Sequence, residues 1–383
     1  MAEPLRNIYD PPFLADFGKL VKVAYGAFDA EGFETEAMAG DWPELELKAR
    51  MRRITETLGR HLPASYGDAL SVLYAIAPRC KGFAYLIFPD FVERFGQAPA
   101  DWELSMTALE RFTSLSSSEF AVRPFLLAQP ERMMERMKRW ASHPDEHVRR
   151  LSSEGCRPRL PWGQSLPMFK RDPKPVLELL ELLKADPSLY VRKSVANNLN
   201  DIAKDHPDLV LETAARWQGA HPHTDWIIRH GCRTLVRRAV PGALALFGYA
   251  DAGADGGAGP LVAEAAIAAD PSAVSIGQTC VLHYALRARE GGPLRLRVEY
   301  GIDFIKSNGQ SSRKLFLLSD KTVPGGAALA GSRTHRWADL TTRRHYTGPH
   351  RIVLLVNGRE AAETMLRLHA ASGGGTDTEV ELA

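Results

Sequence analysis

The sequence lacks the features that mark membrane, secreted and zinc-binding proteins. In 383 residues no apolar run approaches the ~18 residues that a membrane span needs, and residues 1–22 do not form a signal-peptide pattern. The cysteines are few and widely spaced, with no CxxC pair: Cys80, Cys156, Cys232 and Cys280. These absences predict a cytoplasmic protein with reduced thiols and without a zinc site.

The patterns of several enzyme classes are also missing. P-loop, G-x-S-x-G, G-x-G-x-x-G and H-E-x-x-H patterns do not occur. The stretch from His221 to Asp225 contains two histidines and one aspartate, but Pro222 indicates the beginning of a helix and no partner cluster exists. We therefore expect no metal, no ATP or nicotinamide cofactor and no serine nucleophile.

A repeated pattern is present instead. Three short turns are each followed by a helix that begins with Val-Arg or Ile-Arg, and Arg149, Arg192 and Arg229 recur after 43 and 37 positions. This spacing is typical of stacked helix pairs. Between the turns the apolar residues follow a helical period, as in residues 176–183. The pattern predicts a HEAT-like helical-repeat solenoid whose concave wall carries positive charge.

The period changes from 3.6 to 2 after a stretch rich in Gly, Ala and Asp. The later segments alternate apolar and polar residues, and Gly291-Gly292 and Asn357-Gly358 have the composition of hairpin turns. This pattern indicates an immunoglobulin-like β-sandwich of about seven strands. We therefore predict a mainly α protein with a helical-repeat domain (1–248), a flexible linker (249–260), a β-sandwich domain (261–371) and a disordered tail (372–383).

The overall net charge of +2 conceals an uneven distribution. Residues 1–100 carry a net charge of −3, whereas residues 101–247 carry +4 and residues 261–370 carry +6. Basic segments of this kind are a hint of a nucleic-acid partner.

Residues 154–163 interrupt the solenoid. Two prolines and two glycines argue against a helix there, and the segment carries Glu154, Arg157, Arg159 and Trp162. A loop with these side chains in a basic groove is a candidate functional site. The alternative is an ordinary loop between repeats whose tryptophan packs.

Two further carboxylates have open interpretations. Asp201 ends a polar run that also contains Asn197, Asn198 and Asn200, which is unusual in a helix because Asn and Asp compete with the backbone for hydrogen bonds. These residues are either functional or ordinary polar side chains at a helix end. Glu119 has the spacing of a capping-box partner for Ser116.

The helical region resembles the AlkC-type family of bacterial DNA alkylation-repair glycosylases. The family also has a long form with an immunoglobulin-like C-terminal domain, which matches the β-rich segment by pattern. The resembling segments are FAYLIFPDFV (83–92), SSEFAVRPF (117–125), EHVRRL (146–151), EGCRPRLPW (154–162) and DPSLYVRKSVANNLND (186–201).

The resemblance implies hydrolysis of the N-glycosidic bond of 3-methyladenine, 3-methylcytosine and similar small cationic bases. It assigns Glu119, Glu154 and Asp201 to electrostatic stabilisation of the cationic sugar and to orientation of a water. It assigns Trp162 to contact with the sugar and the cationic base. It also implies that the lesion stays stacked in the duplex and is not flipped out.

The partner expected from these features is double-stranded DNA that contains alkylated bases, bound by a monomer without a membrane contact. Basic neighbours must offset the repulsion between the carboxylates and the phosphates. The residues that we expect to contact DNA are Arg149, Arg150, Arg157, Arg159, Arg192, Lys193 and Arg229, with Lys306, Asn308, Arg313 and Lys314 from a hairpin-like loop of the β-domain.

Three classes of function therefore remain. We favour a monofunctional DNA glycosylase that acts in base excision repair and associates with the nucleoid through DNA. A non-catalytic DNA-binding repeat protein and a protein-interaction scaffold are the alternatives.

Overall fold

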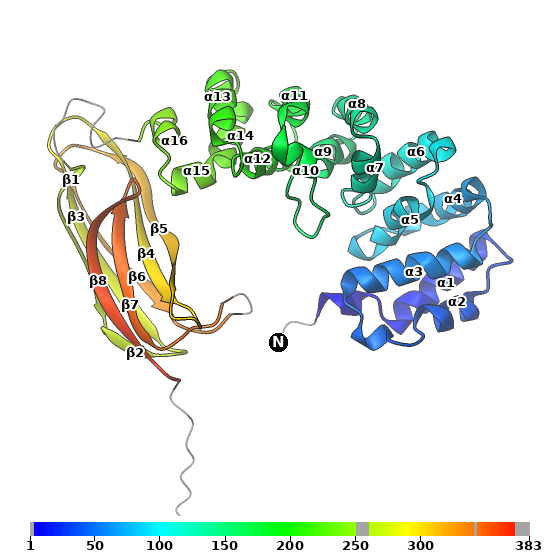
Figure 1. The fold of residues 1–383 in the computed structure, drawn as a ribbon, viewed down its shortest axis with the longest axis horizontal. Helices are drawn as coiled ribbons and strands as arrows, with labels where there is room; N and C mark the ends of the chain where they lie inside the picture. The colour runs from blue at the N-terminus through cyan, green and yellow to red at the C-terminus, as the bar shows by residue number, and fades with distance from the viewer. Residues whose placement is uncertain (1–3, 250–259, 341–342, 372–383) are drawn as a thin grey trace, which may run out of the picture. The chain divides into compact units, whose positions relative to one another are not determined.

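The computed structural model describes residues 4–249, 260–340 and 343–371, and the chain divides into two units, Met1–Cys232 and Arg233–Ala383 (Figure 1). The predicted linker, apart from its end residues 249 and 260, and the predicted tail lie outside the described residues. Within the described ranges no helix is long and apolar enough to cross a membrane.

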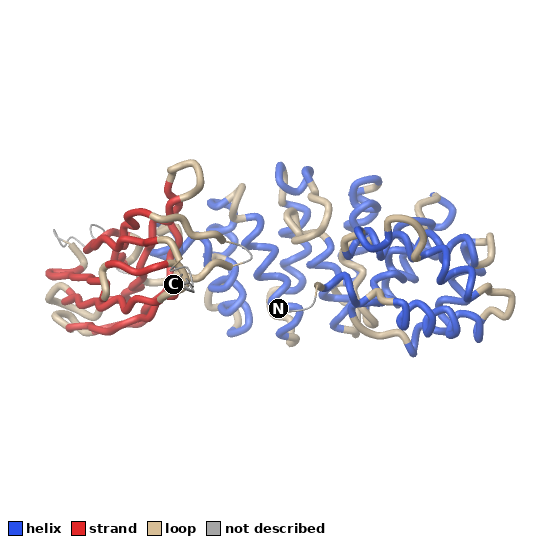
Figure 2. The backbone as a smooth tube through the Cα atoms, turned by 90° about the horizontal axis from the view of Figure 1, so that it is seen from below, coloured by secondary structure: helices blue, strands red, loops and turns tan. Residues whose placement is uncertain are grey.

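The first unit is built from helices stacked along a curved path (Figures 1 and 2). They are α1 (Pro11–Ala24), α2 (Ala30–Ala37), α3 (Leu47–His61), α4 (Tyr66–Ile76), α5 (Ile87–Phe95), α6 (Trp102–Thr113), α7 (Val122–Ala128), α8 (Pro130–Trp140), α9 (Glu146–Gly155), α10 (Pro167–Arg171), α11 (Lys174–Leu183), α12 (Leu189–Ile202), α13 (Pro207–Trp217) and α14 (Pro222–Gly231).

The repeated turns begin α9, α12 and α14, and these three helices form an inner layer in which α12 packs against both others. Helices α8, α11 and α13 cover this layer. Asp145 caps α9 by accepting a hydrogen bond from the His147 N–H at 2.8 Å, and Ser188 caps α12 in the same way. The apolar face predicted for residues 176–183 lies on α11 and is buried. The predicted helical repeat is thus confirmed.

The second unit contains a β-sandwich together with two short helices, α15 (Arg233–Arg237) and α16 (Pro241–Leu246). Its sheets have the strand orders β1-β3-β6 and β2-β8-β7-β4-β5. The strands are β1 (Val262–Asp270), β2 (Ala273–Ser275), β3 (Thr279–Ala288), β4 (Leu294–Ile305), β5 (Ser311–Val323), β6 (Ala328–Arg336), β7 (Gly348–Val356) and β8 (Arg359–His369).

One predicted hairpin turn is present and the other is not. Asn357-Gly358 joins the antiparallel neighbours β7 and β8 with φ angles of 48° and 79°, and a Cβ added to Gly358 would meet the Cβ of Ala239 at 2.0 Å. Gly291-Gly292 instead connects β3 to β4, which lie in different sheets. The prediction of a hairpin there was wrong because turn composition does not specify which strands pair.

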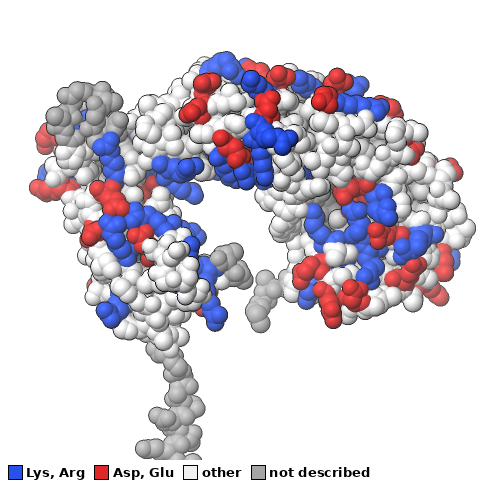
Figure 3. Space-filling view, viewed as in Figure 1, with Lys and Arg blue, Asp and Glu red and all other residues white. Residues whose placement is uncertain are grey.

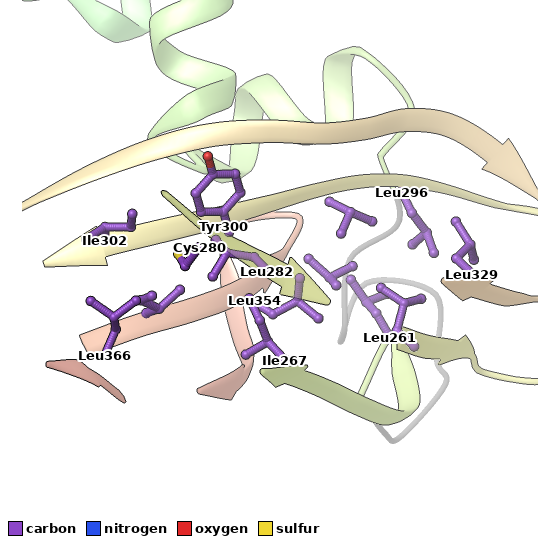
Figure 4. Close-up of a cluster of buried hydrophobic side chains, with 14 of the residues drawn as sticks. Leu261, Ile267, Cys280, Leu282, Leu296, Tyr300, Ile302, Leu329, Leu354 and Leu366 are labelled. Carbon is purple, nitrogen blue, oxygen red and sulfur yellow. The ribbon is translucent and has the colours of Figure 1, made fainter. Parts of the chain in front are cut away.

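The core of the sandwich lies between the two sheets (Figure 4). Strand β4 contributes a buried residue at every second position: Leu294, Leu296, Val298, Tyr300, Ile302 and Phe304. This alternation is the period of 2 seen in the sequence. All four cysteines of the chain are buried and free, as predicted.

Three buried histidines lie at one end of this core. The His335 ring lies 5.1 Å from the Trp337 ring, and His345 and His350 are 5.8 Å and 4.9 Å from the same ring, centroid to centroid. Burial, followed by the charges of Arg343, His345 and Lys314, lowers the pKa of His335 from 6.5 to about 4. Burial is also the main reason why the pKa values of His345 and His350 are lowered.

We expect acid to destabilise the sandwich through His335. Its native pKa lies below its unfolded value, so the stability that neutral His335 contributes is present above pH 6.5 and is lost as the pH falls towards 4. Between these limits the free energy of unfolding should fall by up to about 3 kcal/mol more in the wild type than in His335→Gln. Urea denaturation of both proteins at several pH values measures this difference, and parallel pH profiles would contradict the expectation.

Candidate active site

A cleft of about 510 Å³ lies in the first unit and gathers residues from distant parts of the chain. One wall comes from residues 82–86 and 115–120, on either side of α5 and α6. The opposite wall comes from the end of α9, the loop that follows it and the beginning of α12. The polar side chains on the cleft are Ser116, Ser117, Glu119, Arg150, Glu154, Arg157 and Tyr190.

Arg157 joins two of the predicted carboxylates. Its Nη1 donates to Oε1 of Glu154 at 2.6 Å and its Nε donates to Oδ2 of Asp201 at 2.8 Å. The three residues are only 8%, 5% and 2% exposed, respectively. Burial by itself lowers the pKa of Arg157, but attraction to Glu154 and Asp201 outweighs it, so the pKa of this guanidinium is raised. Arg157 therefore remains charged between the two carboxylates.

Arg150 continues the same alternation and approaches the same oxygen of Glu154. Its Nη2 lies 3.5 Å from Oε1 of Glu154, and its Nη1 donates to Oε2 of Glu119. We call the sequence Glu119, Arg150, Glu154, Arg157 and Asp201 the carboxylate–arginine chain. Three carboxylates and two guanidinium groups alternate in it, so each cation is shared and the formal charge of the chain is −1.

The capping interpretation of Glu119 was wrong. Helix α7 begins at Val122 without a side-chain cap, and the hydroxyl of Ser116 donates to the carbonyl of Tyr85 at 3.3 Å. Glu119 accepts a hydrogen bond from the hydroxyl of Ser117 at 2.8 Å in addition to its ion pair with Arg150. Its carboxylate therefore belongs to the cleft and not to a helix end.

The polar run on α12 has a packing reason. Ser194, Asn198 and Asp201 lie on one face of α12, which contacts the end of α9. Ser194 donates to Oε2 of Glu154 at 2.6 Å, and Asn198 donates to the carbonyl of Ser153 at 2.8 Å. The side-chain oxygen of Asn198 is buried without a hydrogen-bond partner. Ser194, Asn198 and Asp201 are therefore buried in the contact between α12 and the end of α9 and do not face solvent.

The loop after α9 presents Trp162 at the cleft. The structure places Glu154 and Gly155 in the last turn of α9, so the helix extends two residues further than the prolines and glycines of this segment suggested. Trp162 has a φ of 61° and is 65% exposed. The ring is thus available to a ligand in the cleft.

Arg123 anchors this loop and was not identified from the sequence. Its Nη1 donates to the carbonyls of Gly155 and Arg157 at 2.8 Å and 3.0 Å, and its Nε donates to the carbonyl of Gln164. The side chain is 1% exposed, and burial lowers its pKa from 12.5 to about 10. The available signal was an arginine within the otherwise apolar segment of α7.

Two of the arginines that we predicted to line a DNA-binding groove, Arg149 and Arg192, make hydrogen bonds within the protein. Arg149 donates to both carboxylate oxygens of Asp186, at 2.7 Å and 3.2 Å, and to the carbonyls of His143 and Pro144. Arg192 donates to the carbonyls of Asp186 and Pro187. Both guanidinium groups hold the turn before their own helix, because the repeat places an arginine beside carbonyl groups that the turn leaves unpaired.

The other predicted basic residues have varied surroundings. Arg159 pairs with Asp205 at 2.6 Å, Lys193 is exposed on α12, and Arg229 lies in the last turn of α14. Figure 3 shows lysine and arginine side chains mixed with acidic ones on the visible face of the first unit. In the second unit Lys306 and Asn308 lie at the β4–β5 hairpin, whereas Arg313 pairs with Asp303 and Glu360, and Lys314 is exposed on β5.

We find no metal-binding group in residues 4–249, 260–340 and 343–371. In these ranges no three His, Cys, Asp or Glu side chains are placed to hold an ion together.

Comparisons with known proteins define the class. Residues 93–235 match the model of the DNA alkylation repair enzyme family, and residues 263–370 match that of the YhaZ C-terminal Ig-like domain. The uncharacterised protein YhaZ of Bacillus subtilis (strain 168) is 44% identical over 92% of this chain and 96% of its own length. The alkylpurine DNA glycosylase AlkC of Pseudomonas fluorescens, solved with DNA containing an abasic site analog, is 39% identical with a TM-score of 0.90, covering 96% of this chain and 100% of that one.

These matches extend over both units. The fold is that of the helical-repeat DNA alkylation-repair proteins, with an immunoglobulin-like domain at the C-terminal side. The chain belongs to the AlkC-type family of DNA alkylation-repair glycosylases, in its long form.

We expect Arg149→Ala to destabilise the first unit, because it leaves the carboxylate of Asp186, which is 7% exposed, without its bidentate partner. Loss of one member of a buried ion pair typically costs about 3 kcal/mol. The control Lys193→Ala removes an exposed cation from the same helical layer and should leave stability unchanged. Thermal or urea unfolding compares the three proteins. If Arg149→Ala were as stable as the wild type but bound DNA more weakly and with a shallower salt dependence, Arg149 would be a DNA contact, as the sequence predicted.

Proposed function

We propose that this protein is a DNA glycosylase that hydrolyses the N-glycosidic bond of small cationic alkylated bases, 3-methyladenine and 3-methylcytosine, in double-stranded DNA. The observation that carries the proposal is the carboxylate–arginine chain, which places Glu119 and Glu154 on a cleft together with the exposed ring of Trp162. Membership of the AlkC-type family supports the same reaction class.

The chemistry requires little help for the leaving group. A cationic alkylated base departs as a neutral molecule, so the bond breaks with development of positive charge on the deoxyribose. Carboxylates fixed beside that sugar stabilise the charge and can orient the water that adds to it. The carboxylates of Glu119 and Glu154 supply local negative charge at the cleft, while Arg150 and Arg157 keep these carboxylates in place.

The carboxylates are not equivalent in position. Glu119 and Glu154 are on the cleft surface, whereas Asp201 lies behind Arg157 and also accepts a hydrogen bond from Lys204 at 3.0 Å. We therefore infer that Glu119 and Glu154 face the sugar directly. Asp201 acts by holding Arg157 in place.

Trp162 provides an aromatic face for the cationic base. A ring that is 65% exposed on a cleft wall suits contact with a lesion that remains in the duplex, because an extruded base is normally enclosed between side chains. We infer that excision proceeds without base flipping and by hydrolysis alone, and that the protein acts as a monomer on DNA.

The direct test is release of free bases from methylated duplex DNA, detected by chromatography. We expect free 3-methyladenine or 3-methylcytosine in the presence of EDTA and without added nucleotide. The appearance of nucleosides instead of bases, or complete inhibition by the chelator, would contradict the proposed reaction. Binding of the duplex without any base release would favour a non-catalytic DNA-binding protein.

Substitution of the carboxylates tests the mechanism. Glu154→Gln and Asp201→Asn remove charge at nearly constant shape, and we expect single-turnover base release to fall by about 10²- to 10³-fold. Affinity for undamaged duplex should rise slightly, because an anion that repels phosphate is lost. Glu119→Gln should also slow base release. The carboxylate of Glu119 lies on the cleft, where it is paired with Arg150, and it does not cap a helix. Wild-type rates in all three variants would exclude the proposed active site.

A further inference from the structure

Lys48 connects the N-terminal helices to the loop that carries Trp162. It lies in the first turn of α3, and its Nζ donates to the carbonyl of Trp162 at 2.7 Å, across 114 positions of the chain. The same ammonium group lies 4.2 Å from the centroid of the Phe120 ring, which lines the cleft beside Glu119. One side chain therefore contacts both walls of the cleft.

The backbone at Trp162 requires such support. The N–H of Gly163 donates to the carbonyl of Leu160 at 3.0 Å, which closes a turn with Pro161 in the second position and Trp162 in the third. The φ of Trp162 is 61°, and a type II turn requires a positive φ at this position, where glycine is normal because a side chain is strained at positive φ. An aromatic residue in this conformation is strained and persists only where surrounding contacts hold it.

The two ends of the loop and its tip are held by different residues. Arg123 binds the carbonyls of Gly155, Arg157 and Gln164, which lie before and after the turn. The bond from Lys48 reaches the tip itself, at the strained residue. Without this bond Arg123 still holds the two ends of the loop, but the hydrogen bond that fixes the carbonyl of Trp162 is lost.

The position of Lys48 is itself fixed by an ion-pair network. Arg52, one turn later on α3, donates to the carboxylates of Asp90 at 2.8 Å and Glu93 at 2.6 Å on α5. Asp90 is buried, and burial raises its pKa from 3.8 to about 6 despite the opposing effect of Arg52. This network holds α3 against α5 and so directs Lys48 towards the cleft.

We propose that Lys48 is a positioning residue that holds the Trp162 ring in its ligand-facing orientation. The role in base excision rests on the proposed function, whereas the contact itself does not. The ammonium group of Lys48 binds a backbone carbonyl and the face of Phe120 within the protein. In this respect Lys48 differs from a cation whose role is to bind phosphate.

The test compares Lys48→Met, Lys48→Arg and the control Lys22→Met. Met matches the length of the lysine stem but cannot donate a hydrogen bond, while Arg can donate to the carbonyl and stack on Phe120. Lys22 is an exposed lysine of α1 outside the cleft. Each variant is also made in a Trp162→Phe background, so that subtraction isolates the fluorescence of Trp162.

The first readout needs no substrate. We expect Lys48→Met to change the emission of Trp162 and to increase its quenching by acrylamide, with the signal largely restored in Lys48→Arg and unchanged in Lys22→Met. Unchanged Trp162 emission and quenching in Lys48→Met would overturn the inference whether or not the protein excises bases.

The second readout is base release in single-turnover reactions. Loss of a charge-assisted hydrogen bond predicts a rate that is about 10- to 100-fold lower in Lys48→Met, with partial rescue in Lys48→Arg. Affinity for undamaged duplex should change less than about threefold. A lower affinity with a shallower salt dependence and an unchanged excision rate would instead make Lys48 a phosphate contact. If the wild type releases no base, the proposed function is wrong. The fluorescence of Trp162 still tests whether Lys48 positions its ring.

Discussion

The arrangement of the first unit depends on how three carboxylates, two on the cleft and one behind it, are accommodated close together. Removing a carboxylate from water is costly unless a cation and hydrogen-bond donors replace the lost hydration. The chain that runs from Glu119 through Arg150, Glu154 and Arg157 to Asp201 meets this need by sharing each guanidinium between two carboxylates. The ammonium group of Lys204 balances the remaining charge at Asp201, so the carboxylates that reach the cleft, Glu119 and Glu154, are held in place without a large net charge.

Much of the surrounding structure supports that alternation. The polar face of α12 supplies Ser194 to Oε2 of Glu154 and Asn198 to the carbonyl of Ser153, so both groups have a donor at the buried end of α9. Arg123 and Lys48 then fix the loop that carries Trp162, from its ends and from its tip. The carboxylates and the aromatic ring are therefore held by separate sets of contacts, and substitutions can address each set independently.

The second unit follows a different principle. Its sheets enclose an apolar core, but one end of that core contains three histidines around Trp337, all with lowered pKa values because burial disfavours their charged form. The short helices α15 and α16 belong to this unit, and Tyr249 beyond them donates a hydrogen bond to Asp320 at 2.6 Å. Residues 233–248, which we predicted to belong to the helical domain, thus form part of the second unit.

The features that repeat locally could be predicted from the sequence. The period of 3.6 in the helical part, the period of 2 in the sandwich and the turn at Asn357-Gly358 depend on neighbouring residues, and the structure contains all three. The resemblance also selected Glu119, Glu154, Asp201 and Trp162, whose side chains the fold brings to one region. The partners of the individual charges, in contrast, depend on how the helices pack. Arg149 and Arg150 are adjacent in the sequence, yet one holds a turn through Asp186 and the other joins Glu119 to Glu154. Lys48 and Trp162 are 114 positions apart and gave no sign of contact. The pairing of a charge depends on which distant side chains the packed helices place within a few ångströms, and local sequence patterns do not encode those distances.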